Sequence, residues 1–216
     1  VLESQQLVQL DSKDMDFATW ALLAQVCRDR LADPDVAALV ITHGTDTIEE
    51  TAWFLQCVLE LSKPVVLTCA MRPATALSPD GPANLRDAIC FAASGRAGVW
   101  VSAAGEIHAA MHVRKVHPYR LHAFSSDSAG VAAWVEEGEV RWNGVQPEVV
   151  SQIQCKVPLL SGSHTWPWVE VLYSVAGANG RTIDALVAAG VQGLVLAGAG
   201  NGSIHKSLND ALLRAQ

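Results

Sequence analysis

The chain has 216 residues, of which 50% are hydrophobic and 17% are charged, and its formal net charge is −7. This composition predicts a globular protein with enough chain for one domain and part of a second. The densest cationic run, residues 114–117, is too short to follow a phosphate backbone, so nucleic acid is not an expected partner. The apolar stretch 36–42 is well short of the ~18–20 residues that cross a bilayer, so a membrane is not expected either.

The cysteines are spread along the chain without the paired spacing of a zinc site or a disulfide framework. They are Cys27, Cys57, Cys69, Cys90 and Cys155. Free, buried thiols favour the cytoplasm over the periplasm, although a large periplasmic domain needs no disulfide. Residues 1–5 show no cationic start followed by an apolar run, so we expect a secretory signal to be absent or already removed.

Predicted strands and helices alternate in the first half of the chain. Residues 37–42 form a continuous apolar run ending in His43-Gly44, which is typical of a strand covered on both faces. Thr47 and Glu50 have the spacing of a capping box and predict a helix that continues to Leu59. The next predicted elements are a strand at 63–68, a helix at 82–93 and a strand at 98–102. This alternation predicts an α/β fold with an open, mostly parallel sheet flanked by helices.

The pattern changes after residue 127, where shorter pieces include a predicted hairpin of residues 132–135 and 140–142. A second run of elements then follows: strand 169–173, helix 181–189, strand 191–198 and helix 203–214. We therefore expect a first α/β domain at 1–142, a connector at 143–168 and part of a second, smaller α/β domain at 169–216. Two strands and two helices hardly complete such a domain, so we expect the chain to be incomplete after residue 216.

The strongest local signal for function is His43-Gly44-Thr45-Asp46-Thr47, at the predicted carboxyl end of a buried strand. Open α/β sheets bind their ligands at this edge, and here two hydroxyls and a carboxylate would face the crevice. The same residues fit equally well a simple turn with Thr47 as the helix cap and Asp46 favoured by the helix dipole.

Five segments together resemble one family, in the same order. They are 41–51 (ITHGTDTIEET), 63–75 (KPVVLTCAMRPAT), 80–85 (DGPANL), 106–110 (EIHAA) and 197–202 (AGAGNG). The chain thus resembles the bacterial L-asparaginases, and the Ala-Met-Arg-Pro form at 70–73 is similar to their type II branch. The resemblance implies hydrolysis of L-asparagine to L-aspartate and ammonia by a threonine-based acyl-enzyme mechanism, with no metal or organic cofactor. It also implies a homotetramer built as a dimer of dimers.

The resemblance also implies site residues. Thr45, Asp46 and Lys115 match the Thr-Asp-Lys part of the asparaginase site: Lys115 as an uncharged base, Thr45 as its neighbour and Asp46 as the partner of the substrate α-ammonium. Asp11-Ser12 resembles the loop that binds the α-carboxylate, and Ala70 is expected in the substrate pocket. Without the resemblance, Lys115 would be interpreted as a solvated surface charge and Ser12 as a loop hydroxyl.

The chain departs from the family most clearly at the nucleophile. The family's nucleophilic threonine lies in a Thr-Gly-Gly-Thr-Ile turn that does not occur in these 216 residues, so we expect the chain to be incomplete at its front. A start codon at or near Val1 would instead favour a non-catalytic amino-acid-binding fragment. Lys13 stands where many members have glutamine, and Cys69 where glycine is common. A glutaminase-asparaginase of broad specificity is the alternative enzyme, since one methylene changes binding by only ~1–3 kcal/mol.

Two other patterns do not support a site. His108 and His112 are four residues apart, but the zinc-protease glutamate is missing between them, so no metal is expected. The glycines at 198–202 precede Lys206, but a phosphate loop requires glycine where the chain has His205.

Overall fold

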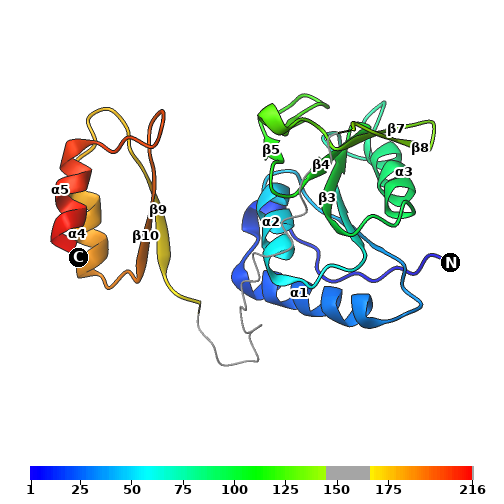
Figure 1. The fold of residues 1–216 in the computed structure, drawn as a ribbon, viewed down its shortest axis with the longest axis horizontal. Helices are drawn as coiled ribbons and strands as arrows, with labels where there is room; N and C mark the ends of the chain where they lie inside the picture. The colour runs from blue at the N-terminus through cyan, green and yellow to red at the C-terminus, as the bar shows by residue number, and fades with distance from the viewer. Residues whose placement is uncertain (145–165, 216) are drawn as a thin grey trace. The chain divides into compact units, whose positions relative to one another are not determined.

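The computed structural model describes residues 1–144 and 166–215 of the chain. It divides into two compact units, Val1–Ser161 and Gly162–Gln216, which are shown in Figure 1 and described separately. Among the described residues, no helix has both the length and the apolar content that a bilayer crossing requires.

The first unit is built on a six-stranded sheet with the strand order β1-β2-β3-β4-β7-β8. Its strands are β1 (Leu39–Thr42), β2 (Pro64–Thr68), β3 (Gly98–Ala103), β4 (Glu106–Ala109), β7 (Ala133–Glu136) and β8 (Glu139–Trp142). β1, β2 and β3 pair in parallel, whereas β4, β7 and β8 pair antiparallel with their neighbours. Since β7 runs in the direction of β3, four of the six strands point the same way. The predicted α/β sheet and the predicted hairpin are confirmed.

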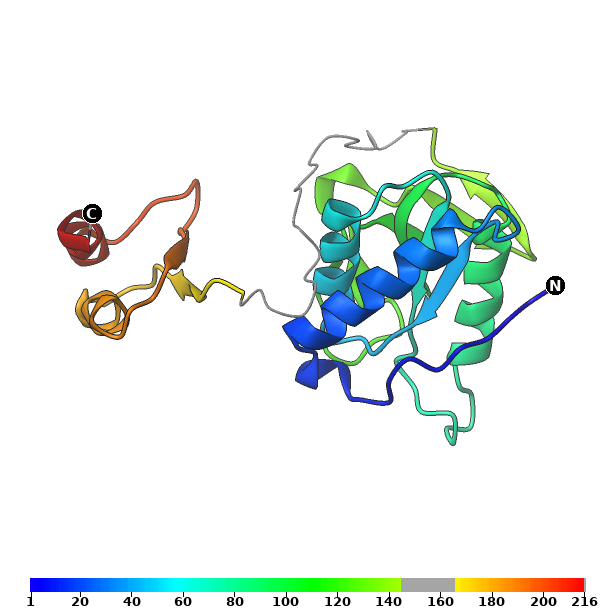
Figure 2. The same cartoon turned by 90° about the horizontal axis from the view of Figure 1, so that it is seen from below.

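Helices cover both faces of this sheet. α1 (Phe17–Ala32) and α2 (Ile48–Val58) lie on one face, and α3 (Gly81–Ala92) lies on the other (Figure 2). Alternate residues of β2 divide between the two cores, because successive side chains of a strand point to opposite faces. Val65 and Leu67 pack into the α1–α2 core, and Val66 packs into the α3 core. The sheet is therefore buried on both sides, as the continuous apolar run of each parallel strand predicts.

Helix α1 is not among the elements predicted from the sequence. Asp16 begins it, and the Asp16 carboxylate accepts a hydrogen bond of 2.7 Å from the Thr19 amide. Its buried residues are spaced along one helical face: Leu23, Ala24, Cys27 and Leu31. Trp20 also fixes it against α2 by stacking on Phe54, with 5.1 Å between ring centroids. The Asp-x-x-Thr start and this spacing are the signals that could have found the helix.

A separate two-stranded sheet in the first unit consists of β5 (Arg114–Lys115) and β6 (Phe124–Ser125), which pair antiparallel. Two short 3-10 helices, η1 (Ser12–Asp14) and η2 (Asp127–Ala129), complete the described elements of this unit.

The second unit has two parallel strands, β9 (Val169–Tyr173) and β10 (Gly193–Ala197). Helices α4 (Arg181–Ala188) and α5 (Lys206–Ala215) pack on one face of this pair. These four elements confirm the second predicted run to within a few residues. The connector expected at 143–168 lies, apart from its ends, outside the described residues, so the 1–142, 143–168 and 169–216 division stays a prediction.

Candidate active site

The candidate site lies at the carboxyl end of the parallel strands, in the turn between β1 and α2. The His43 amide donates to the Thr68 carbonyl at 2.8 Å, which extends the β1–β2 pairing by one residue. Gly44, Thr45 and Asp46 then lead into α2, so the hydroxyl and the carboxylate stand at the edge where open α/β sheets bind ligands.

Lys115 reaches this turn from β5, 70 residues further along the chain. Its Nζ lies 2.8 Å from the Thr45 Oγ1 and 2.5 Å from the Asp46 Oδ1. The Lys115 side chain is only 16% exposed, whereas that of Asp46 is 53% exposed. Lys115 is therefore a partly buried amine held in an ion pair, and the outer side of the Asp46 carboxylate faces solvent.

Ser12 packs beneath the turn and is 3% exposed. Its hydroxyl oxygen accepts a hydrogen bond of 3.2 Å from the Asp46 amide, and its carbonyl accepts one of 2.7 Å from the Thr47 hydroxyl. Thr47 is the N-cap residue of α2, as predicted, but the predicted capping box is wrong, because the Thr47 hydroxyl bonds the Ser12 carbonyl and makes no cap hydrogen bond. A Cβ at Gly44 would lie 2.5 Å from the Ser12 Oγ, so only glycine allows this close approach.

Asp11 and Lys13 lie on either side of Ser12 and bond to each other. The Lys13 Nζ is 2.9 Å from the Asp11 carboxylate and 3.0 Å from that of Asp14. The hydrogen bond from the Lys13 side chain holds the pKa of the exposed Asp11 carboxyl below its usual value. The Lys13 ammonium is thus shared by two neighbouring carboxylates of its own loop.

Ala70 is exposed in the loop that follows β2, at the same edge of the sheet as Thr45. Asp80 stabilises this loop by accepting hydrogen bonds from the Met71 and Arg72 amides at 2.9 and 2.8 Å. The buried Asn84 then joins the loop to the sheet: its Nδ2 donates to the Cys69 carbonyl at 2.8 Å, and its Oδ1 accepts from the Ala104 amide at 3.0 Å.

Two features of the site are absent from the sequence prediction. The first is a hydrogen-bonded series in which the Trp20 indole donates to the Thr51 hydroxyl at 2.9 Å and that hydroxyl contacts the His43 Nε2 at 3.0 Å. The His43 Nδ1 bonds the Gly44 carbonyl, and burial lowers the pKa of His43. The second is Glu49, whose carboxylate accepts a hydrogen bond from the Lys115 backbone amide. In the sequence, the predicted helix start at 47–50 contains Glu49 but gives no sign of its bond to Lys115, and no pattern links Trp20 with Thr51.

The histidines weighed as metal ligands occupy different environments. His108 is fully buried, with its Nδ1 2.9 Å from the Ser126 hydroxyl and its Nε2 3.6 Å from a Glu106 carboxylate oxygen. Burial lowers the pKa of His108 to about 4. Within 1–144 and 166–215, no three histidine, cysteine or acidic side chains gather as a set that could hold a metal ion.

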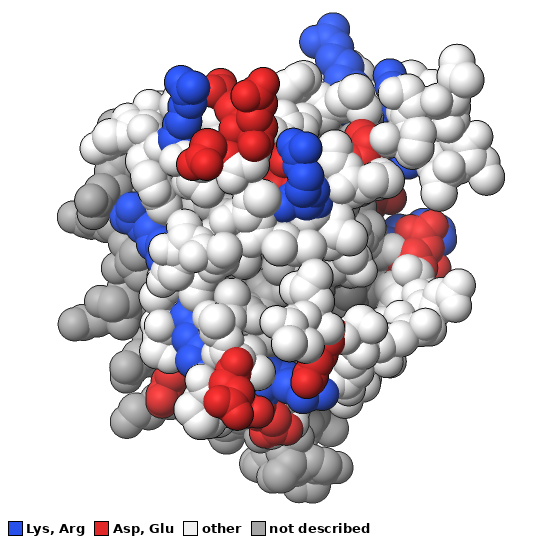
Figure 3. Space-filling model, turned by 90° about the vertical axis from the view of Figure 1, so that its right-hand side faces the viewer, with Lys and Arg blue, Asp and Glu red and all other residues white. Residues whose placement is uncertain are grey.

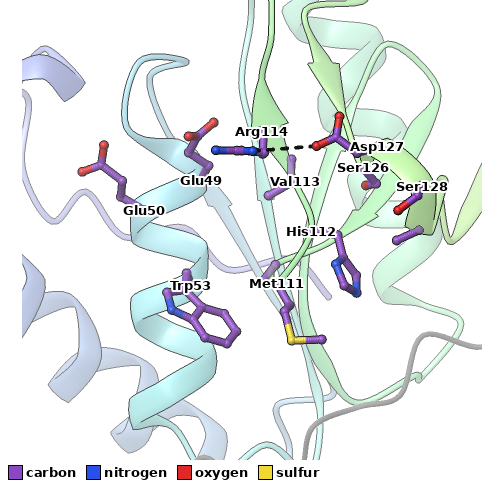
Figure 4. A pocket seen from close by; sticks show the side chains of 12 residues that line it. Glu49, Glu50, Trp53, Met111, His112, Val113, Arg114, Ser126, Asp127 and Ser128 are labelled. Carbon is purple, nitrogen blue, oxygen red and sulfur yellow. Dashed lines mark ion pairs between the residues drawn. The ribbon is translucent and has the colours of Figure 1, made fainter. Parts of the chain in front are cut away.

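A hollow of about 570 Å³ lies beside β5 (Figure 4). Glu49 and Trp53 from α2, Met111, Arg114 from β5 and Asp127 from η2 are among its lining residues. Arg114 pairs with Asp127 at 3.8 Å. On the face of the first unit shown in Figure 3, basic and acidic side chains lie interspersed and form no continuous basic stripe.

Comparison with known proteins identifies the family. The family model for the N-terminal domain of asparaginases matches residues 1–148, more than half of the chain. The chain belongs to the asparaginase family. The model for the glutaminase/asparaginase C-terminal domain matches residues 168–216.

Individual members of the asparaginase family are similar over nearly the whole chain. A probable periplasmic L-asparaginase of Haemophilus influenzae is 36% identical, with 99% of this chain and 61% of the relative covered. A glutaminase-asparaginase of Acinetobacter glutaminasificans is 35% identical, with 94% of this chain and 62% of the relative covered. The crystal structure of a probable cytoplasmic L-asparaginase from Campylobacter jejuni matches with a TM-score of 0.84 and 36% identity, over 97% of this chain and 67% of that one. The chain thus spans about 61% of the length of such curated relatives.

Proposed function

We propose that the complete protein hydrolyses the side-chain amide of L-asparagine to L-aspartate and ammonia. The observation that carries the proposal is the position of the Lys115 Nζ, 2.8 Å from the Thr45 hydroxyl and 2.5 Å from the Asp46 carboxylate. A hydroxyl beside a partly buried amine is an arrangement that moves a proton to or from a reacting oxygen. Membership of the asparaginase family supports the amide as the substrate group.

Asp46 and Ser12 are the proposed substrate-binding residues. The exposed side of the Asp46 carboxylate would bind the substrate α-ammonium as a charge-assisted pair. The Ser12 oxygen already accepts from the Asp46 amide, so its own O–H is left to donate to the α-carboxylate. Asp11 and Ala70, on the adjoining loops, complete the proposed pocket.

Substrate binding would also change the contacts of Lys115. The α-ammonium and the Lys115 ammonium compete for one carboxylate, so binding would weaken the Lys115–Asp46 pair. With its carboxylate partner engaged by the substrate, the Lys115 amine is the group beside Thr45 that we propose as the base.

The proposed chemistry has two steps. A threonine hydroxyl, which the family resemblance assigns to a Thr-Gly-Gly-Thr-Ile turn not contained in these 216 residues, attacks the amide carbon. The C–N bond breaks, and the nitrogen leaves as ammonia with the hydroxyl proton. Water then attacks the resulting ester while Thr45 and Lys115 take its proton. The ester C–O bond breaks, aspartate is released, and the proton passes to the threonine oxygen, which becomes a hydroxyl again. The reaction requires no metal or organic cofactor.

Replacing the two proton-handling residues tests the proposal in the complete protein. Thr45→Val and Lys115→Met should each lower kcat by about 10²–10⁴-fold, with the fold retained, because each removes a positioned proton-transfer group. Ammonia release from asparagine measures the effect, and Lys206→Met, an exposed lysine of α5, is the matched control. Near-normal rates in both variants would reject the assignment. If the unchanged complete protein binds aspartate but releases no ammonia from asparagine, it would instead be an amino-acid-binding module.

Broad glutaminase-asparaginase activity is the second candidate, favoured by the 35% identity to a protein that carries this name. A pocket that accepts one extra methylene discriminates by only ~1–3 kcal/mol, so glutamine would be used at a rate within about 200-fold of asparagine. Steady-state kcat/KM values measured side by side on both amides decide between a specific and a broad enzyme.

For assembly, the family resemblance supports a homotetramer built as a dimer of dimers. Light scattering of the complete protein should give four times the chain mass, and a monomer at micromolar concentration would reject the proposal. For the compartment, the thiols of Cys27, Cys69 and Cys90, which form no disulfide among the described residues, support the cytoplasm. Cys155 lies outside the described residues. Fractionation of cells that produce the complete protein tests this.

A further inference from the structure

Lys115 lies on an element that the main sheet does not hold. β5 is two residues long, and its strand partner is β6, with Lys115 opposite Phe124 and Arg114 opposite Ser125. None of the six strands of the main sheet pairs with β5 among the described residues. A two-stranded ribbon of this size is marginally stable by itself, so the position of Lys115 depends on other contacts.

Glu49 supplies one such contact. Its carboxylate accepts a hydrogen bond from the Lys115 backbone amide, across 66 residues of sequence. Glu49 lies in the first turn of α2, only a few residues after Thr45 and Asp46. One short segment, residues 45–49, therefore holds Lys115 at both ends: Thr45 and Asp46 bind its Nζ, and Glu49 binds its backbone.

We propose that Glu49 is a positioning residue, which fixes the backbone of Lys115 so that its amine stays within reach of Thr45. The inference rests on the proposed function of Lys115 as the base. A hydrogen bond from an amide to a carboxylate is about twice as strong as one between neutral groups, and a carboxylate in the first turn of a helix is favoured by the helix dipole. Glu49 thus gives β5 a firm attachment to the turn that carries the other site residues.

Glu50 shows that the contact is specific to one of two adjacent acids. Both side chains line the hollow beside β5, but Glu49 points toward Arg114 and β5 and Glu50 points away (Figure 4). Glu50 is exposed, and its carboxylate makes no hydrogen bond or ion pair with the described residues. Glu50 is therefore a matched control on the same helical turn.

The test compares kcat for asparagine in variants of the complete protein. Glu49→Leu should lower kcat by about tenfold or more, since displacements near 1 Å at a reacting group cost up to about 100-fold. Glu49→Gln keeps an acceptor oxygen and should lose less than Glu49→Leu. Glu49→Asp keeps the charge but is one methylene too short, and it replaces Glu49→Leu if that variant unfolds. Glu50→Leu should behave as the unchanged protein.

A double-mutant cycle separates positioning from a structural role. If Glu49 acts through the Lys115 amine, Glu49→Leu should cost about tenfold in the unchanged protein but little in the Lys115→Met background. Equal losses in both backgrounds would overturn the proposal, as would full activity of Glu49→Leu.

Amide hydrogen exchange gives a readout that does not depend on turnover. The Lys115 N–H should exchange faster in Glu49→Leu or Glu49→Asp than in the unchanged protein, and at an unchanged rate in Glu50→Leu. Unchanged protection in the Glu49 variants would overturn the positioning role even if the enzyme is active. If the Lys115 N–H exchanges faster in the Glu49 variants but the unchanged protein releases no ammonia from asparagine or glutamine, the proposed function is rejected, whereas the positioning of Lys115 by Glu49 is supported.

Discussion

At the residue scale, the close approach of Gly44 to Ser12 couples backbone shape to the proposed substrate contact. Gly44 does not need a left-handed conformation; it needs the absence of a side chain, because a Cβ would lie 2.5 Å from the Ser12 Oγ and 2.7 Å from the Ser12 Cβ. Ser12 in turn holds the Asp46 amide and the Thr47 hydroxyl. A single methyl group at Gly44 would therefore disturb both loops of the site.

Gly44→Ala should destabilise the protein by about 1–3 kcal/mol, which is the usual cost of overpacking. It should also raise KM for asparagine, because Ser12 is displaced. Urea unfolding and steady-state kinetics measure the two effects. Adding Ser12→Gly removes the opposing atoms, so the double variant should recover stability without recovering KM. If the double variant instead loses as much free energy of unfolding as the two single variants together, the clash between Gly44→Ala and Ser12 is not the cause.

His108 is a second residue whose environment predicts a measurable effect. Burial lowers its pKa from the ordinary value of 6.5 to about 4, so the folded protein keeps it neutral where the unfolded chain protonates it. Above pH 6.5 both states are neutral and stability is unaffected. As pH falls from 6.5 to 4 the unfolded state gains protons and stability falls, by about 3 kcal/mol in total.

Replacing His108 tests this pH dependence. His108→Asn keeps a polar group near Ser126 but removes the titration, so its free energy of unfolding should change less between pH 6.5 and 4 than that of the unchanged protein. Urea unfolding at several pH values measures both curves. If the free energy of unfolding falls equally with pH in both proteins, the effect assigned to His108 is contradicted.

The residues of the site differ in how far the sequence reveals them. The position of Thr45 and Asp46 could be predicted locally, because a buried strand followed by a helix places its last residues at the binding edge, but their role was distinguished from a simple turn only by the family resemblance. Lys115 and Ser12 required the family resemblance, since they lie 70 and 34 residues from their partners and no periodic pattern links such distances. Glu49 could not be singled out from Glu50, since only the structure shows which of the two side chains faces β5.

At the element scale, Asn84 joins three parts of the first unit. From the first turn of α3, its amide group bonds the Cys69 carbonyl after β2 and the Ala104 amide after β3. The side chain is 3% exposed, so water cannot replace these partners without rearrangement.

Asn84→Ala should therefore lower the free energy of unfolding by about 2–4 kcal/mol, because the Cys69 carbonyl and the Ala104 amide both lose their partner. Chemical denaturation measures the loss, and Asn209→Ala, at an exposed position of α5, should change stability by less than about 0.5 kcal/mol. Equal effects of the two substitutions would show that the Asn84 bonds contribute little.

The elements also differ in how well the sequence predicts them. β1, β2, β3 and α3 were found because continuous apolar runs and a proline near a helix start are strong local signals. α1 was missed although Asp16 caps it, and β5 and β6 are too short to give any periodic pattern. The position of β5 also depends on contacts distant in sequence, such as the one with Glu49, which no short window of residues contains.

At the scale of the whole molecule, the described helices of the second unit cover only one face of its sheet. α4 and α5 pack on one side of β9 and β10, and on the other side Val169, Val171, Tyr173 and Val195 are 47% to 73% exposed. Val171 and Val195 are direct neighbours across the two strands. Apolar surface gathered in this way binds hydrophobic dyes and other apolar surfaces.

The 216-residue chain should therefore enhance the fluorescence of anilinonaphthalene sulfonate. Val171→Thr with Val195→Thr should reduce the signal, with little loss of stability because both side chains are exposed. Val187→Thr, at an exposed position of α4, is the control. An unchanged signal in the double variant would place the dye elsewhere.

The ribbon that carries Lys115 has one further consequence, for protein engineering. Its strands are joined by residues 116–123, and Tyr119 in this turn is 87% exposed. Lengthening a surface loop costs little, about 0.6 kcal/mol for each doubling, so extra residues between Arg120 and Leu121 would leave the register of Lys115 with Phe124 intact. The emission of a fluorophore attached there would respond to movement of β5 and β6, the two strands of the ribbon that carries Lys115.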